Sequence, residues 1–263
     1  MPSVAANGID IYYERSGDGP RLLFLNGSGS TLATSALLIK PFAQRFDVAA
    51  HDQRGLGETS IPPGPYTMAD YAADATALLD HLGWDSCRVF GVSFGGMVAQ
   101  ELAVTSPERV ERLVLSCTSP GGAGGASYPL HELEHLPEKE RAAKAVQLLD
   151  TRFDRQWLAE HPNDRALVEM MAARRSGTQT DDQLRGQAEQ LRARAHHDVC
   201  DRLHRITCPT LVASGRYDGI APLPNGEFIA AHVPHSELRI YEGGHAFFAQ
   251  DPKALPEILD FLG

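Results

Sequence analysis

Several features are scarce in this chain of 263 residues, and each scarcity disfavours a class of protein. Its four cysteines form no Cys-x-x-Cys pair, which disfavours a zinc cluster or a thiol redox motif. They are expected to be mostly buried free thiols, as in a reducing cytoplasm. No apolar run approaches the roughly 20 residues that a membrane helix needs, and the N-terminus lacks the pattern of a secretory signal. We therefore expect a cytoplasmic protein with no membrane partner.

Positive charge is also in short supply. The chain has 34 acidic and 24 basic residues, and its formal net charge is −10. Such a surface repels phosphate backbones, so no nucleic-acid partner is expected. The remaining composition, 43% hydrophobic and 22% charged, suits one globular α/β domain or one domain with an insertion. A chain of this length buries a large core without disulfides or metals.

Short apolar runs, each of which predicts a buried strand, recur along the chain. The chain opens with a hairpin signal, Asn7-Gly8, between short strands at residues 4–5 and 9–13. Further apolar runs rich in Val, Leu and Ile end at Gly, Asp or Ser; they lie within residues 21–27, 45–52, 86–93, 110–120, 208–218 and 236–245. Together they predict eight strands.

Helical patterns separate most of these runs. Helical spacing covers residues 68–84, 95–107 and 251–262. The last of these helices is expected to begin with Asp251 as its N-cap and Pro252 at its first position. Strands that alternate with helices predict an α/β fold whose mostly parallel sheet is covered by helices on both faces.

The alternation stops between residues 121 and 205. The glycine-rich stretch "SPGGAGGASYP" leads into Arg-, Glu- and Ala-rich segments with helical spacing and no convincing strand. We interpret residues 121–205 as an inserted helical cap, and residues 1–120 and 206–263 as the core. Because glycine imposes little conformational bias, the glycine-rich stretch is expected to act as a hinge for a lid.

The stretch "VFGVSFGGMVAQ" places Ser93 between Gly91 and Gly95, after a predicted strand and before a predicted helix. Small residues on both sides allow a sharp strand-to-helix turn that exposes a serine hydroxyl at its tip. A phosphate-binding loop would need its glycines at another spacing. The pattern therefore predicts that Ser93 is a nucleophile.

A serine hydroxyl needs a base to remove its proton, and the base needs an acid to orient it. Asp218 and His245 each follow a predicted parallel strand, as Ser93 does. Parallel strands bring their carboxyl ends to one edge of the sheet, so the three residues are expected to meet there. Each residue alone is ambiguous, since a lone aspartate is usually a turn residue and a lone histidine is usually structural.

With these motifs in view, the chain resembles the α/β-hydrolase superfamily, in particular its cap-bearing esterase, lactonase and C–C hydrolase branch. The resemblance covers nearly the whole chain and depends most on "GVSFGG", "HDQRGLGETS", "CPTLVASGRYDGIAP" and "YEGGHAFFAQDP". It implies that Ser93 is the nucleophile, Asp218 the acid and His245 the base. It also implies an acyl-enzyme mechanism with no cofactor and no metal.

The resemblance further implies an oxyanion hole made of two backbone N–H groups. Phe94, which follows the nucleophile, supplies one, and Ser28, in the loop after "LLFLNG", supplies the other. Family members usually carry His-Gly before this donor, whereas this chain has Asn26-Gly27. We expect Asn26, Met97 and Phe247 to contact substrate; Met97 and Phe247, like Phe248, could equally belong to the core.

Other polar residues are given structural interpretations. Asp52 and Arg54 are expected to form tight turns after a strand rather than a metal or anion site. His51 is expected to pack or to hydrogen-bond locally. The segment of His196, His197, Asp198 and Cys200 is interpreted as a solvated face of the cap rather than a metal site.

These inferences predict a serine hydrolase that cleaves a small or medium carboxylic ester or lactone. A 3-oxoadipate enol-lactonase, a C–C bond hydrolase of ring-cleavage products and a cofactor-free haloperoxidase or perhydrolase would use the same triad and remain alternatives. A ligand-sensing protein that keeps the triad without turnover is a further alternative from a different class. The sequence does not indicate an oligomeric state.

Overall fold

The computed structural model of this protein describes residues 3–173 and 179–263. Its centre is one eight-stranded sheet with the strand order β1-β2-β4-β3-β5-β6-β7-β8. The strands are β1 (Ser3–Ala6), β2 (Ile9–Ser16), β3 (Arg21–Leu25), β4 (Asp47–His51), β5 (Cys87–Val92), β6 (Val110–Ser116), β7 (Thr210–Gly215) and β8 (Ser236–Tyr241). The pairs from β4 through β8 are parallel, whereas β1 and β2 run antiparallel to their neighbours. The predicted mostly parallel eight-stranded sheet is confirmed.

The predicted hairpin at the N-terminus is present. Val4 pairs with Ile11 across β1 and β2, and Asn7 and Gly8 join the two strands with φ values of 48° and 77°. Two consecutive positive φ values suit the right-handed twist of paired strands, and Asn-Gly adopts them at little cost.

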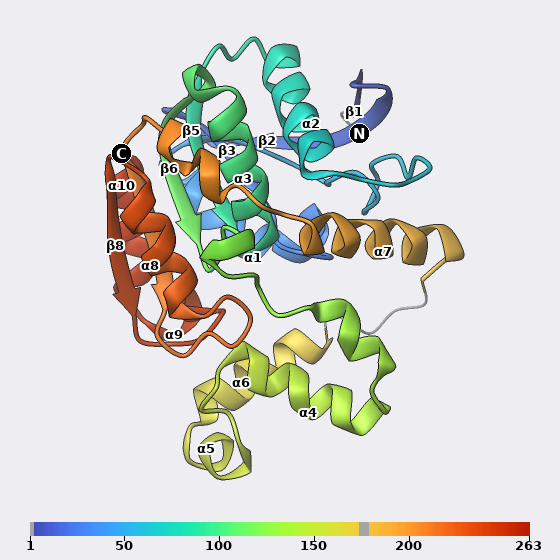
Figure 1. Cartoon of the computed structure of the whole chain (residues 1–263), viewed down its shortest axis with the longest axis vertical. Coiled ribbons are helices and arrows are strands. Elements are labelled where there is room, and N and C mark those ends of the chain that lie inside the picture. The colour runs from blue at the N-terminus through green and yellow to red at the C-terminus, as the bar shows by residue number, and fades with distance from the viewer. Residues whose placement is uncertain (1–2, 174–178) are drawn as a thin grey trace.

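Helices cover both faces of the sheet (Figure 1). One face packs against α2 (Met68–His81), α3 (Phe94–Thr105) and α8 (Leu223–His232), and the other against α1 (Leu32–Ala43), the short α9 (Phe247–Gln250) and α10 (Ala254–Leu262). A 3₁₀ turn, Pro107–Arg109, follows α3. Among the described residues no helix is both long and apolar enough to span a membrane.

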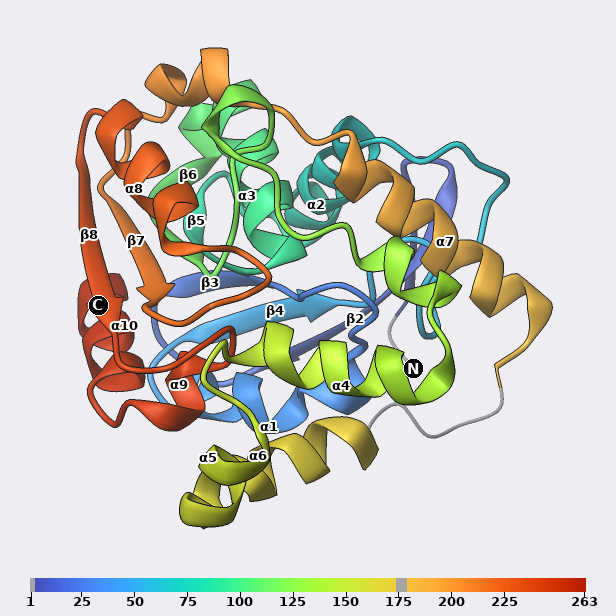
Figure 2. The same ribbon diagram turned by 60° about the horizontal axis from the view of Figure 1, so that its bottom comes forward.

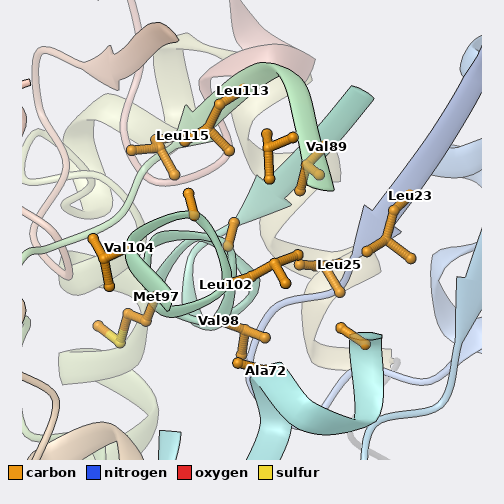
Figure 3. Close-up of a cluster of buried hydrophobic side chains, with 14 of the residues drawn as sticks. Leu23, Leu25, Ala72, Val89, Met97, Val98, Leu102, Val104, Leu113 and Leu115 are labelled. Carbon is orange, nitrogen blue, oxygen red and sulfur yellow. The ribbon is translucent and has the colours of Figure 1, made fainter. Parts of the chain in front are cut away.

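Every residue of α3 from Phe94 to Val104 is buried. Figure 3 shows its Val98 and Leu102 surrounded by apolar side chains from the sheet and from α2. The labelled neighbours include Leu23, Leu25, Val89, Leu113, Leu115 and Ala72. This packing fixes the start of α3, where Ser93 lies, against three neighbouring strands.

The C-terminal helix begins later than predicted, and Asp251 is not its N-cap. Helix α10 begins at Ala254 with Lys253 at the cap position, while Asp251 ends α9. The Asp251 side chain instead accepts hydrogen bonds from the backbone N–H groups of Lys253, at 3.0 Å, and Glu242, at 2.9 Å. The aspartate therefore joins β8 to the turn between two helices, a tertiary role that a helix-start pattern does not reveal.

Among the described residues of 121–205 there is no strand; helices joined by loops make up the segment, with one isolated bridge between Gly121 and Asp198. The segment contains α4 (Glu138–Leu149), α5 (Arg155–Glu160), α6 (Pro162–Ala173), α7 (Asp181–Ala195) and the 3₁₀ turns Gly122–Gly124, Leu130–His135 and Cys200–Arg205. Part of the predicted cap, residues 174–178, lies outside the described residues. Figure 1 shows α4, α5 and α6 beyond the end of the sheet toward which β6 and β8 point, and Figure 2 shows α4 and α7 from that end.

The glycine-rich stretch at the start of this segment is a packed turn. A Cβ at Gly121 would lie 1.8 Å from the carbonyl oxygen of His197, and one at Gly122 would lie 2.3 Å from the Asp198 carboxylate. Both residues have positive φ. Glycine is therefore required here by close contact between two chain segments and not only by freedom of the backbone.

Candidate active site

Ser93 lies in the turn between β5 and α3, where the sequence predicts it. Its φ of 55° and ψ of −115° are strained for a residue with a side chain. The strained turn is held by its neighbours: the Ser93 N–H donates to the Ser116 carbonyl at 2.8 Å, and the Thr118 hydroxyl donates to the Ser93 carbonyl at 2.7 Å. Ser116 at the end of β6 and Thr118 just beyond it therefore hold the Ser93 backbone in this conformation.

The glycines around Ser93 have steric reasons to be glycines. A Cβ at Gly91 would lie 2.4 Å from the carbonyl oxygen of Gly95, and a Cβ at Gly95 would lie 2.0 Å from that of Leu25. One at Gly96 would meet the Thr118 side chain at 2.6 Å. Any larger residue at these positions would push α3 away from the sheet, so the glycine pattern reflects the crowding that the sharp turn creates.

His245 joins the serine to the acid. Its Nε2 lies 2.9 Å from Ser93 Oγ, and its Nδ1 lies 2.8 Å from Asp218 Oδ2. Both are hydrogen-bond distances, and 152 residues of sequence separate the serine from the histidine. The structure thus brings the predicted Ser93, Asp218 and His245 together at the carboxyl ends of β5, β7 and β8.

The Asp218 carboxylate is buried and fully hydrogen-bonded. While Oδ2 faces the histidine, Oδ1 accepts backbone N–H groups of Ile220 at 2.7 Å and Ala221 at 2.9 Å. These bonds fix the orientation of the carboxylate. A fixed anion at Nδ1 requires that this nitrogen carry the proton, which leaves Nε2 free to accept one from Ser93.

Cys117 lies beside this constellation. The Cys117 Sγ, one carboxylate oxygen of Asp218 and one ring nitrogen of His245 all lie within 4.8 Å of one another. Among the described residues, this is the only group of three or more side chains that is close enough together to hold a metal ion. Burial raises the pKa of the Cys117 thiol well above its usual range. A neutral thiol is a poor metal ligand and does not orient a histidine as a carboxylate does. All four cysteines are free, and three of them are buried.

The loop after β3 passes directly beside Ser93. A Cβ at Gly27 would lie 3.5 Å from the Ser93 Cβ, which places the Asn26–Gly27–Ser28 backbone against the serine. Asn26 is 1% exposed, and neither polar atom of its side chain has a partner among the described residues. The Gln53 side chain braces this loop by donating to the Asn26 carbonyl at 2.6 Å.

Phe94 is the first residue of α3, so its N–H has no acceptor within the helix. Together with the loop containing Ser28, this N–H is available near the serine. Met97 and Phe247 lie elsewhere in the packing: Met97 belongs to the core cluster around α3, and the fully buried Phe247 ring stacks on Tyr241 with centroids 5.0 Å apart. The packing of these two residues favours the core alternative over substrate contact.

The structural interpretation of Asp52 and Arg54 is confirmed. The buried Asp52 carboxylate accepts N–H groups of Leu32 at 2.7 Å and Glu58 at 2.9 Å. The Arg54 guanidinium makes two bonds to Asp74, at 2.6 and 2.7 Å. Both residues therefore have protein partners that fix turns after β4, and neither offers a free binding group.

The segment from His196 to Cys200 is only partly the solvated face that the sequence predicts. His196 is exposed, but His197 is 4% exposed because the chain turns back toward the sheet at the end of α7. The Cys200 thiol donates to the Gly121 carbonyl at 2.9 Å, so it secures the glycine turn. No metal-ligand group forms here among the described residues.

Two residues of the helical segment bond to loops of this site, and a third lies on the same helix face as one of them; the sequence predicts none of the three. The Leu149 carbonyl accepts the His245 backbone N–H at 2.6 Å, and the Gln190 side chain accepts the Gly29 N–H at 2.7 Å. Arg194 lies one helical turn beyond Gln190 and is 5% exposed. Only the spacing of four between Gln190 and Arg194, which places them on one helix face, could have indicated the last two.

Comparison with known proteins identifies the family. The model of the alpha/beta hydrolase fold matches residues 20–252. This chain belongs to the α/β-hydrolase family. A 3-oxoadipate enol-lactonase 2 of Acinetobacter baylyi is 29% identical over 255 residues, covering 96% of this chain and 92% of the relative.

A further relative agrees with this membership, and a solved structure agrees with the fold. A poly(3-hydroxyalkanoate) depolymerase of Ectopseudomonas oleovorans is 31% identical over 249 residues, covering 92% of this chain and 83% of the relative. The crystal structure of the enol-lactonase from Burkholderia xenovorans LB400 superposes with a TM-score of 0.81 at 23% identity, covering 99% of both chains. Its low identity makes it evidence for the fold alone, while family and relatives together support hydrolase chemistry.

Proposed function

We propose that this protein is a serine hydrolase that cleaves small or medium carboxylic esters or lactones. The observation that carries the proposal is the position of His245, within 2.9 Å of Ser93 Oγ and 2.8 Å of Asp218 Oδ2. A hydroxyl, an imidazole and a buried carboxylate in this order form a nucleophile, a general base and an orienting acid. Ser93, His245 and Asp218 take these roles in the proposal.

The reaction would proceed in two halves. As Ser93 Oγ bonds to the substrate carbonyl carbon, its proton passes to His245 Nε2, and the carbonyl electrons move to the oxygen. When this tetrahedral intermediate collapses, the bond to the leaving oxygen breaks and His245 gives that oxygen the proton. Water then repeats the sequence on the acyl-enzyme, which releases the acid and restores Ser93.

The developing oxyanion needs preorganised donors. In the proposal these are the backbone N–H groups of Phe94 and Ser28, because the first begins α3 and the second lies in the loop that passes Ser93. Gln53 would keep that loop in place through the Asn26 carbonyl. No metal or cofactor has a role in these steps.

The enol-lactone alternative is favoured by one observation, the relative that is aligned over 96% of this chain. C–C bond hydrolysis and perhydrolysis use the same three residues and have no separate support from the contacts described above. Rates on p-nitrophenyl acetate, an enol-lactone and a vinylogous diketone, measured side by side, would rank the substrates. The highest kcat/KM is expected for an ester or a lactone.

The direct test is the Ser93→Ala variant. A triad serine contributes on the order of 10⁶ in kcat, so hydrolysis of p-nitrophenyl acetate is expected to fall to background. Mass spectrometry of the wild type after treatment with a small organophosphonate is expected to show one adduct, on Ser93. A folded Ser93→Ala protein that kept a tenth of the wild-type rate, or an adduct on another residue, would refute the proposal.

A further inference from the structure

The face of α7 that packs against the core carries three residues at a spacing of four: Gly186, Gln190 and Arg194. All three are buried. Residues four apart lie above one another on a helix, about 5–6 Å apart at Cβ. This face therefore presents an amide and a guanidinium side by side to the interior.

Through Gln190, this face of α7 contacts the loop after β3, which passes Ser93. Its Oε1 accepts the N–H of Gly29, the residue after Ser28, at 2.7 Å. Its Nε2 has no hydrogen-bond partner among the described residues, although the side chain is 1% exposed. A buried donor without an acceptor costs free energy that an acceptor on a ligand would recover.

Through Arg194, the same face of α7 is connected to the loop that contains Asp218. Its Nη1 donates to the Tyr128 carbonyl at 2.7 Å, and the Tyr128 N–H donates to the Ile220 carbonyl, also at 2.7 Å. Ile220 in turn donates its N–H to Asp218 Oδ1. Burial lowers the pKa of Arg194 to about 10, and the Asp218 charge opposes this effect. The guanidinium is thus still charged at neutral pH.

The Nε and Nη2 atoms of Arg194 have no partner within the described part of the chain. These two N–H groups are parallel and form the edge of the guanidinium that binds both oxygens of a carboxylate. Elsewhere in this protein the same edge is occupied in that way: Arg15 binds Asp47, Arg54 binds Asp74 and Arg152 binds Asp150 through Nε and Nη2. Arg194 is as buried as Arg54, yet it forms no hydrogen bond or salt bridge with a carboxylate among the described residues.

We propose that the free edge of Arg194, together with the Gln190 amide, binds a carboxylate of the substrate. The preferred substrates would then be esters or lactones that carry a carboxylate a few bonds from the reacting carbonyl. This inference rests on the proposed function, since it assigns a substrate class to the same site. Arg194 is a specificity residue in this scheme and takes no part in proton transfer.

The experiment compares substrates that differ in charge and little else. Mono-p-nitrophenyl glutarate is paired with p-nitrophenyl valerate, which has the same number of acyl carbons but no charge. 4-Acetoxybenzoate is paired with phenyl acetate, so that a carboxylate on the leaving group is tested as well. The uncatalysed rate is subtracted for each, because the glutarate ester also hydrolyses through its own carboxylate.

For the wild type, kcat/KM is expected to be higher for the charged member of at least one pair. In Arg194→Gln that preference is expected to fall about 10- to 100-fold, the range for a lost charge-assisted hydrogen bond, while the neutral partner changes less than about threefold. Arg194→Lys is expected to retain part of the preference. The matched control is Arg192→Gln, an exposed arginine on the same helix with 58% side-chain exposure, which is expected to leave both rates unchanged.

Equal rates on both members of both pairs in the wild type would overturn the inference. So would an equal loss on charged and neutral substrates in a folded Arg194→Gln protein, because Arg194 would then act only on the fold. A preference that survives in Arg194→Gln would assign the carboxylate to another group. Failure of the proposed function is separate from all three results, since it would appear as hydrolysis that persists in Ser93→Ala.

Discussion

The carbonyl oxygen of Leu149 accepts the backbone N–H of His245 at 2.6 Å, so the end of α4 is bonded directly to the histidine of the candidate site. The acid loop is held in the same way. The Gly219 N–H donates to the Leu148 carbonyl at 3.1 Å, and the Thr151 N–H donates to the Tyr217 carbonyl at 2.9 Å. The helical segment therefore positions both loops in addition to covering the end of the sheet.

Side chains reinforce this connection. The fully buried Asp150 carboxylate binds Arg152 at 2.9 and 2.6 Å and accepts the Gln250 amide at 3.0 Å. The same amide donates to Asp164 at 3.2 Å, while its oxygen accepts the N–H of Gly244 at 2.9 Å. Gln250 thus links the residue before His245 to two carboxylates of the helical segment.

Replacing Gln250 by Glu is expected to weaken this link. The new carboxylate would face the Asp150 and Asp164 carboxylates and repel both. Because the loss of a buried hydrogen bond costs about 1–3 kcal/mol, kcat for p-nitrophenyl acetate is expected to fall about tenfold, with little change in KM. Gln156→Glu is the control, because Gln156 binds Glu160 at 3.0 Å on the exposed surface, where charges are screened. Equal kinetics in both variants would show that Gln250 does not position the histidine loop.

Asp218, and not Cys117, is expected to orient His245. Asp218→Asn favours the wrong histidine tautomer and removes the charge that stabilises the imidazolium, so kcat should decrease by roughly 10⁴. Cys117→Ser replaces a buried neutral thiol and should stay within about threefold of the wild type if the acid alone sets the histidine. Steady-state kinetics of the two variants decide the matter. The reverse order of losses would place the orienting group on β6.

Hydrolysis is expected to need no metal ion. The Cys117–Asp218–His245 group is committed to other bonds, since both histidine nitrogens already face Asp218 and Ser93. Overnight dialysis against EDTA should therefore leave kcat and KM unchanged. A lasting loss of activity that Zn²⁺ or Mn²⁺ restores would instead require a metal-dependent step.

Short acyl chains are expected to be preferred. Helices α4 and α7 are bonded to the loops around Ser93 through Leu149 and Gln190, which restricts the space available to the acyl group. Across p-nitrophenyl esters from acetate to palmitate, kcat/KM should peak among the short esters and decline steadily beyond them. A maximum at palmitate would mean that the helical segment does not limit chain length.

Stability is expected to fall in mild acid because of buried histidines. Burial lowers the pKa of His51, and likewise of His197, to about 4. The unfolded chain binds these protons near pH 6.5, so it binds more protons than the folded chain between about pH 6.5 and about pH 4, and the free energy of unfolding decreases as the pH falls through that range.

The variant His51→Gln removes one of these titrations. The loss of unfolding free energy between about pH 7 and about pH 5 should then shrink by about 2 kcal/mol relative to the wild type. Urea unfolding at the two pH values measures it. The same pH dependence in variant and wild type would mean that His51 is not neutral in the folded protein.

The sequence predicts those parts of the fold that depend on local pattern. Apolar runs closed by Gly, Asp or Ser identify the six strands β3 to β8, because a strand in the middle of a covered parallel sheet has to be apolar along its short length. The Asn7-Gly8 hairpin signal identifies β1 and β2. The crowding around Ser93 requires glycine at fixed positions, so the local sequence also predicts this turn. Asp218 and His245 follow from the rule that parallel strands share a carboxyl edge.

Contacts between segments that are far apart in the sequence cannot be predicted from local sequence patterns. Helix α1 contains Pro41, and α8 contains Asn225-Gly226, so neither resembles a helix by propensity, although both pack on the sheet. The burial of His197 and the role of Asp251 depend on chain segments that fold back from elsewhere. The contacts of Gln190 with Gly29 and of Arg194 with Tyr128 span 161 and 66 positions of the sequence, and no local signal specifies which loop a helix face meets.

The contact between Gly186 and Gly55 determines how closely α7 packs against the core. A Cβ at Gly186 would be 2.1 Å from the carbonyl oxygen of Gly55, and the backbones touch at this point. Even the single methyl group of Gly186→Ala would lift the helix and withdraw Gln190 and Arg194, one and two turns along, from the loops they contact. Evolution could thus enlarge the site and relax its charge preference through one small substitution at a residue that never meets a substrate.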